Sequence, residues 1–129
     1  MAKQNPFTVV ESIGLTLPGV EVSTSWGRPS LKVRGKMFAC LASHSSAEPD
    51  TLVVMTEFAQ RDALLEEEPD LYYITRHYVD YPCVLVRLPR VNRDILQDLL
   101  TGAYHFVGST QKRSTRPSPV GARVLRGRR

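Results

Sequence analysis

His77 lies in a segment that holds four of the chain's five tyrosines, and this cluster has the residue types for chemistry. An imidazole among phenol rings could carry a proton or line a ligand pocket. Such clusters are more often packing groups with satisfied polar tips. We therefore expect no catalytic residue and no enzyme. The ligand-pocket candidates are Trp26, His77, Tyr78 and Tyr81, with Arg28 placed to receive an anion.

A second candidate site is the basic stretch SWGRPSLKVRGKMFACL at positions 25–41. If Gly35 and Lys36 form a two-residue hairpin turn with glycine first, one strand face is apolar and the cations point away from it. The apolar face then holds Leu31, Val33, Phe38 and Cys40. A basic wing of this kind can contact DNA phosphates, although charged strand faces are also common on solvated surfaces. The predicted nucleic-acid contacts are Arg28, Lys32, Arg34 and Lys36.

The charge of the chain is divided unevenly along its length. Residues 1–108 carry 10 basic and 13 acidic side chains, a net of 10 − 13 = −3, whereas residues 109–129 carry 7 basic and no acidic ones. The second segment also has too few apolar residues to fold alone, so we expect a domain at 1–108 and a disordered basic tail at 109–129. The tail has three open interpretations: DNA contact, docking on Glu66–Glu68, or simple solvation. Its predicted DNA contacts are Lys112, Arg113 and Arg116.

Metal, cofactor and membrane functions have little support in the sequence. Cys40 and His44 form an isolated C-x-x-x-H with no second pair at zinc spacing, so we expect no metal unless the fold brings Cys83 or His77 alongside. Both cysteines sit in apolar runs, where reduced thiols pack as small hydrophobes. No nucleotide-binding or hydrolase motif, membrane-length apolar run or secretory signal is present. We expect a cytoplasmic protein without a cofactor.

The elements that would position these residues can be read from periodicity. Asn5 and Pro6 begin a helix whose apolar residues recur every three or four positions until Pro18. Residues 20–25 then alternate between the two faces of a half-buried strand. A strand at 51–56, a helix at 57–68 and a strand at 83–88 follow. Asn92 then caps a last helix that ends at Gly108. This order predicts an α+β two-layer sandwich in which helices pack on a mostly antiparallel sheet.

The same residues carry a family resemblance over about residues 5–108. The chain resembles the MmcQ/YjbR family in the order of its PG, SWG, PSLKV, KMFA, HY and YPCV elements. The resemblance implies a CyaY-like α+β fold and a double-wing DNA-binding protein, a function inferred for the family from its fold. It carries over no catalytic residues.

Three functions from different classes therefore stay open. The first is weakly sequence-specific binding of double-stranded DNA by the basic hairpin and tail. The second is a small-ligand or protein-interaction module, whose distinguishing sign would be a concave site shared by Trp26 and the segment around His77. The third is a structural partner protein that dimerises through an exposed sheet face or edge.

Overall fold

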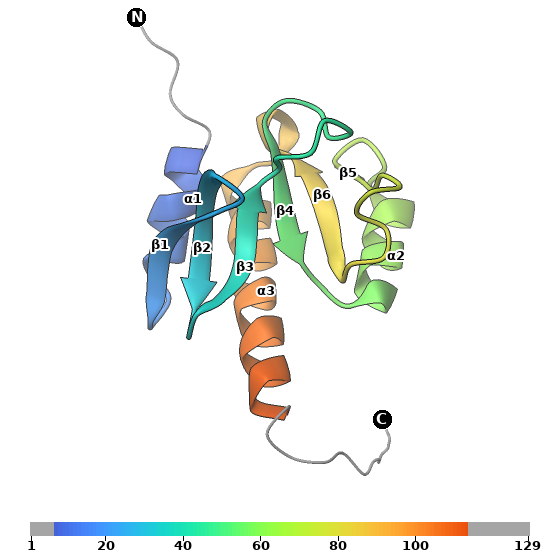
Figure 1. Cartoon of the computed structure of the whole chain (residues 1–129). Coiled ribbons are helices and arrows are strands. Elements are labelled where there is room, and N and C mark those ends of the chain that lie inside the picture. Colours follow the sequence, from blue (N-terminus) through green and yellow to red (C-terminus); the bar gives the residue numbers. More distant parts are fainter. Residues whose placement is uncertain (1–6, 114–129) are drawn as a thin grey trace, which may run out of the picture.

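The computed structural model describes residues 7–113, and the side chains of residues 7–108. Six strands form one antiparallel sheet in the order β1-β2-β3-β4-β6-β5, and three α-helices pack against it (Figure 1). The predicted α+β fold is confirmed. The elements in chain order are α1 (Phe7–Gly14), β1 (Val20–Ser25), β2 (Arg28–Val33), β3 (Lys36–Leu41), β4 (Thr51–Met55), α2 (Phe58–Glu67), β5 (Tyr72–Tyr73), β6 (Cys83–Arg87), the 3₁₀ helix η1 (Leu88–Arg90) and α3 (Arg93–Arg113).

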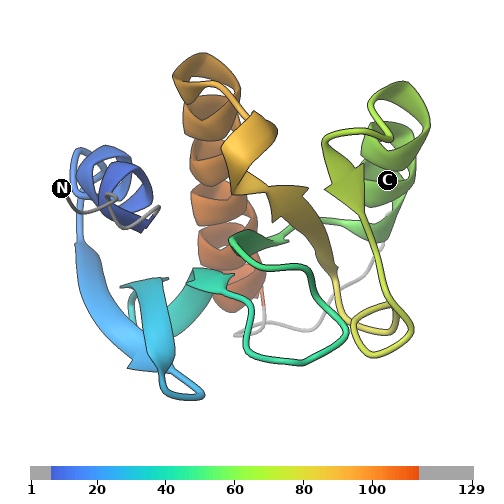
Figure 2. The ribbon, with the colours of Figure 1, turned by 90° about the horizontal axis from the view of Figure 1, so that it is seen from above.

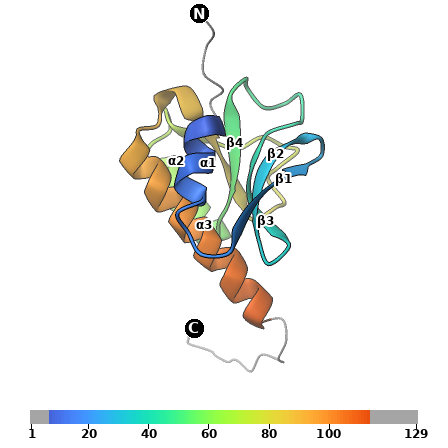
Figure 3. The ribbon, with the colours of Figure 1, turned by 90° about the vertical axis from the view of Figure 1, so that its left-hand side faces the viewer.

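The helices gather on one face of the sheet, and the loops at 42–50 and 74–82 lie on the other (Figures 2 and 3). The main core fills the helix side and includes the fully buried Phe38, Leu52 and Leu100. We call the opposite side the open face. A smaller cluster of Val53, Tyr78, Cys83 and Leu85 covers part of that side. The half of the sheet around β4 and β6 is therefore packed on both sides.

Helix α1 is shorter than its sequence pattern predicts. Phe7, Val10 and Ile13 are buried at the expected spacing, but the α-helix ends at Gly14 rather than continuing to Leu17. The chain continues in tighter turns, in which the Leu17 amide donates to the Gly14 carbonyl at 3.0 Å. The predicted cap at Asn5 and Pro6 lies outside the described residues. Gly14 is buried because the helix passes directly over the side chain of Leu31.

Replacing Gly14 with alanine is expected to destabilise the protein by about 1–2 kcal/mol. The new Cβ would lie 2.5 Å from Cδ1 of the fully buried Leu31, so the core must shift. Urea unfolding of Gly14→Ala measures the loss. Gly102→Ala is the matched control, because its Cβ would meet nothing within 4 Å in a helix. A Gly14→Ala variant as stable as Gly102→Ala would contradict the close approach.

The β2–β3 hairpin has a different register from the predicted one. Its turn is Arg34–Gly35, with φ values of 55° and 79°, and Val33 pairs with Lys36. The prediction of a Gly35–Lys36 turn was wrong by one residue, because a turn with two positive φ values matches the right-handed twist of the strands. The pairing then shifts by one residue between Leu31 and Lys32, which is a β-bulge.

The bulge places Cys40 on the other side of the sheet from the predicted one. Phe38 and Ala39 both join the core under the helices, while Cys40 pairs with Ser30. Because neighbouring strand residues point to opposite faces and Leu31 belongs to the helix side, Cys40 lies toward the open face. Leu31, Val33 and Phe38 are in the main core as predicted, and Cys40 is not.

Helix α3 begins as predicted and ends later than predicted. The side-chain oxygen of Asn92 accepts a hydrogen bond from the Ile95 amide at 2.8 Å, which is the expected N-cap. Gly108 does not end the helix, which runs to Arg113. The side chains of Lys112 and Arg113, and all of Arg116, lie outside the described residues. Within residues 7–113, no helix is long and apolar enough to cross a lipid bilayer.

Candidate binding site on the open face

The chain's only tryptophan lies at the tip of the β1–β2 hairpin. Trp26 and Gly27 form its two-residue turn with φ values of 53° and 77°, and Ser25 pairs with Arg28. Asn, Asp or Gly usually fill the first position of such a turn, since a larger residue is strained there. The Trp26 side chain is also 75% exposed. The hairpin thus displays a large apolar ring at a position that folding alone does not favour.

Trp26 stands at the edge of a hollow of about 380 Å³ on the open face. Its floor comes from β3, β4 and β6, and its far walls come from the loops at 42–50 and 74–82, which lie on the same side in Figure 2. We call it the aromatic hollow. All four predicted pocket residues line it. The lining residues are Trp26, Met37, Ser43, His44, Val53, Met55, His77, Tyr78, Tyr81 and Cys83.

Two stacked histidine rings form one wall of the aromatic hollow. The rings of His44 and His77 lie 3.6 Å apart at an interplanar angle of 7°, and Tyr78 meets His77 edge-on at 4.7 Å. Ser46 ties the two loops together: its amide donates to Nδ1 of His44 at 3.0 Å, and its hydroxyl lies 2.9 Å from that of Thr75. Sequence analysis missed His44 as a pocket residue, because nothing local indicates a partner 33 positions away.

His77 lies beside His44, and such an approach was the condition under which the sequence would allow a metal site. Within the described residues, however, no group of three or more His, Cys, Asp or Glu side chains is placed to hold a metal ion. The stacked rings present a flat aromatic wall instead.

A buried arginine fixes the loop that carries Tyr81. Nη1 of Arg61 donates to the carbonyl oxygens of Val79, Tyr81 and Cys83 at 3.0, 3.1 and 3.3 Å. The Arg61 residue is only 7% exposed, and its guanidinium carbon lies 4.9 Å from the centre of the Phe58 ring. Nothing in the sequence around Arg61 indicates these carbonyl partners, which lie 18 to 22 positions away. Its function is to position the loop.

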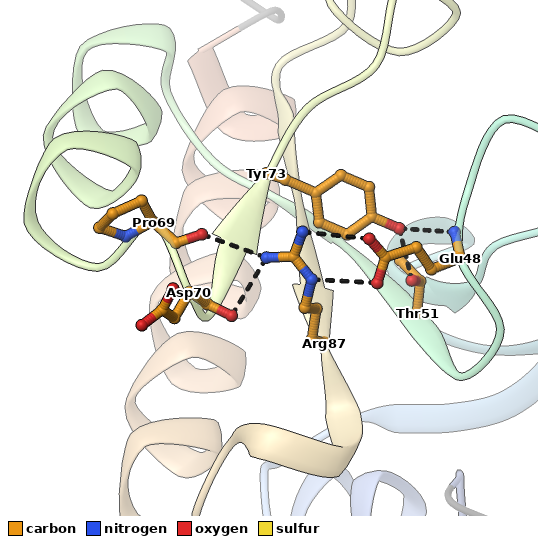
Figure 4. Close-up of polar contacts among 6 residues, drawn as sticks. All are labelled: Glu48, Thr51, Pro69, Asp70, Tyr73 and Arg87. Carbon is orange, nitrogen blue, oxygen red and sulfur yellow. Dashed lines mark hydrogen bonds and ion pairs between the residues drawn. The ribbon is translucent and has the colours of Figure 1, made fainter.

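A second arginine anchors the loop that carries His44 (Figure 4). Nε and Nη2 of Arg87 donate to the two carboxylate oxygens of Glu48 at 3.0 and 3.1 Å, and Nη1 donates to the carbonyls of Pro69 and Asp70. The guanidinium lies over the ring of Tyr73, 4.4 Å from its centre. Hydrogen bonding from Arg87 lowers the pKa of Glu48. These contacts tie the 42–50 loop and the turn at Pro69 and Asp70 to β6.

Both cysteines are free and buried near the open face. Burial raises the pKa of Cys83 to about 11, against a smaller opposing effect of Arg61. Burial likewise raises the pKa of Cys40 to about 11, although Arg28 and Lys32 act in the opposite direction. At neutral pH both thiols are therefore protonated. A thiol in that state is a poor nucleophile.

These thiols predict a loss of stability at alkaline pH. The unfolded thiols ionise near pH 9, whereas the folded ones keep their protons until about pH 11. The unfolded state therefore releases protons first, and the free energy of unfolding falls across that window. Urea unfolding from pH 8 to 11 should show a smaller fall for the double variant Cys40→Ala/Cys83→Ala than for the parent. Equal falls would mean that other groups cause the effect.

The four predicted hairpin cations do not share one surface. Lys32 pairs with Met37 of the aromatic hollow, and Arg28 pairs with Ser25 beside it. Arg34 instead lines a depression on the helix side with Pro18, Tyr104 and His105, so the expectation that it shares a face with Lys32 was wrong. Lys36 follows the turn opposite Val33. None of the four makes an ion pair with a described side chain.

Comparison with known proteins identifies the family. The family model YjbR matches residues 15–106, which include the Trp26 turn and the segment around His77. The chain belongs to the YjbR family. Uncharacterised proteins of Mycobacterium bovis and Mycobacterium tuberculosis are 30% identical to this YjbR protein over 80 residues, a stretch that covers 62% of this chain and 62% of each relative.

A solved structure supports the same fold. The crystal structure of Deinococcus radiodurans protein DR2400, described by the domain DUF419, has a TM-score of 0.65 to this YjbR protein. The two are 19% identical, and the match covers 95% of this chain and all of that one. At this identity the likeness concerns the fold alone.

Proposed function

We propose that this YjbR protein is a non-catalytic binding module whose site is the aromatic hollow. The observation that carries the proposal is Trp26, a mostly exposed ring held in a left-handed turn at the edge of a concave site. Solvent-facing aromatic side chains around an apolar floor are typical of ligand sites. The free, protonated thiols favour binding over nucleophilic catalysis, and they fit a protein of the reducing cytoplasm.

The hollow favours a flat, partly apolar group. The parallel rings of His44 and His77 offer one planar wall, and Tyr81, which is 55% exposed, flanks them with its centre 6.4 Å from that of His77. The cations of Arg28 and Lys32 lie on the same face. A planar ring that carries a negative group meets both features, since stacking and charge can act together.

Anilinonaphthalene sulfonate is a suitable probe, because it is a planar aromatic anion whose emission rises in apolar sites. We expect saturable binding that quenches Trp26, the chain's only tryptophan. Tyr81→Ala should lower the affinity for the probe by about three- to tenfold. Val79→Ala is the control, since Val79 is exposed on the same loop and does not line the hollow. Equal affinities for the two variants, or binding that leaves Trp26 emission unchanged, would reject the proposal.

The second candidate function is binding of double-stranded DNA. It is favoured by Arg28 and Lys32 on the open face, which make no ion pair with a side chain of residues 7–108. The negative charge of residues 1–108 counts against it. The test is fluorescence anisotropy of a labelled mixed-sequence duplex at two salt concentrations. If DNA runs along the open face, Arg28→Ala/Lys32→Ala should lower affinity and make the salt dependence shallower by about 0.9 per lost phosphate contact. Arg34→Ala/Lys36→Ala should have a smaller effect.

The tail is tested in the same assay. A variant with Lys112, Arg113 and Arg116 changed to alanine separates contacts of the tail from those of the hairpin. If this variant alone loses affinity, DNA binding belongs to the tail. If no variant differs from the parent, the DNA function is rejected for the hairpin and for these three residues of the tail.

A further inference from the structure

The helix side of the molecule has its own groove, on the opposite face from the aromatic hollow. It encloses about 630 Å³ between α2 and α3, with the end of β4 as its floor. Its apolar lining includes Leu64 of α2 and Leu99 and Phe106 of α3, which pack on the core with only part of their surface. We call it the helix groove. Figure 2 shows how α2 stands beside α3 on the helix side of the sheet.

The helix groove is negatively charged at its rim. Glu57 and Asp98 line it, whereas no lysine or arginine among residues 7–108 does. On α2, Glu67 continues the stripe of Gln60 and Leu64 at helical spacing, and on α3 Asp94 precedes Asp98 by one turn. All four carboxylates are on exposed residues. A ligand that fits this site must therefore combine apolar groups with positive charge.

We propose that residues 114–129 of this chain dock in the helix groove. The segment carries five arginines and no acidic residue, together with Val120, Val124 and Leu125. This composition complements both the carboxylates at the rim and the apolar lining. The inference does not depend on what the aromatic hollow binds.

Helix α3 ends close enough to the helix groove for the segment to reach it. Phe106 lines the groove, and Arg113 ends the helix seven residues later, a rise of about 10 Å. Sixteen residues can span up to about 50 Å when extended, so the chain can turn back along α3 and reach Asp98 and Glu57. Docking would bring the arginines to the helix side, away from Arg28 and Lys32. Since exposed ion pairs weaken with salt, rising ionic strength should release the segment.

The test is paramagnetic broadening in the full chain. A nitroxide on Ser118→Cys, with Cys40 and Cys83 changed to alanine, should broaden the amide signals of Gln60, Gly102 and Phe106. Those of Thr24 and Gly27, at the far edge of the sheet, should stay sharp. Charge reversal by Glu57→Lys/Asp98→Lys should restore at least half of the lost intensity. Glu21→Lys/Asp80→Lys, which reverses two exposed acids outside the groove, should not.

Several results would overturn the proposal. They are broadening centred on the open face, broadening spread evenly over the surface, and broadening unaffected by Glu57→Lys/Asp98→Lys. A mixture of isotope-labelled chain without nitroxide and unlabelled chain with it tests a second copy as the occupant, and broadening in that mixture would also overturn it. Unchanged shifts of the β3 amides, relative to the labelled parent, show that each charge-reversal variant keeps its fold.

Discussion

Replacing Arg61 with methionine is expected to lower the free energy of unfolding by about 3–5 kcal/mol. The guanidinium donates to three carbonyl oxygens of the segment 79–83, and its residue is almost fully buried. Methionine fills similar volume but leaves those carbonyls without their donor. The last turn of the 74–82 loop should then detach from α2. The protein becomes less stable, and the hollow loses the wall that carries Tyr81.

Urea unfolding measures the loss of stability. The rate of alkylation of Cys83 at pH 8 reports whether the 74–82 loop has opened. Arg61→Met should speed alkylation, because Cys83 is buried beneath that loop in the parent. Arg76→Met is the control: Arg76 is an exposed arginine on the same loop, and its removal should change stability by less than about 0.5 kcal/mol. If the two variants have equal free energies of unfolding, the three hydrogen bonds contribute little to the stability of the fold.

Replacing Trp26 with asparagine should have opposite effects on binding and on stability. Asparagine suits the first position of a turn with positive φ, so the free energy of unfolding should rise by about 0.5–1 kcal/mol. The same change removes the ring from the edge of the aromatic hollow. Affinity for anilinonaphthalene sulfonate should fall by about tenfold, because the dye loses one aromatic contact. The emission of the dye itself measures that affinity.

Trp26→Phe separates the two effects. It keeps an aromatic ring in the same strained turn, so it should retain most of the affinity and gain no stability. A Trp26→Asn variant that is less stable than the parent would mean that the indole supports the fold. A variant that binds the dye as tightly as the parent would place the site elsewhere.

The parts of the fold that the sequence predicts are those with a local physical cause. Asn92 caps α3 because its side chain satisfies an amide three residues away. Val84 and Val86 of β6 are fully buried in a short apolar run with strand propensity. The β2–β3 register depends instead on which turn the strand twist accepts. Since Arg34–Gly35 and Gly35–Lys36 both offer a glycine, the sequence alone favoured the wrong one.

The candidate site was predictable by residue type more than by contact. The aromatic side chains could be selected because four tyrosines cluster around His77, and Trp26 because it is the chain's only tryptophan. The stacking of His44 on His77 and the hydrogen bonds of Arg61 to segment 79–83 join positions that are 18 or more residues apart. The antiparallel pairing of β4 with β6 brings the loops around His44 and His77 together, and no periodicity reports that pairing.

The two-sided packing of β4 and β6 divides the sheet into a rigid half and a pliant half. Apolar clusters cover both faces of those strands, whereas β1 is an edge strand whose Val22 is 43% exposed. Local opening is easiest where fewest apolar groups are buried. The histidine wall of the hollow therefore stands on the rigid half and Trp26 on the pliant half. We expect the width of the mouth to follow the bending of one hairpin, so the proposed site would adapt to ligands of different thickness.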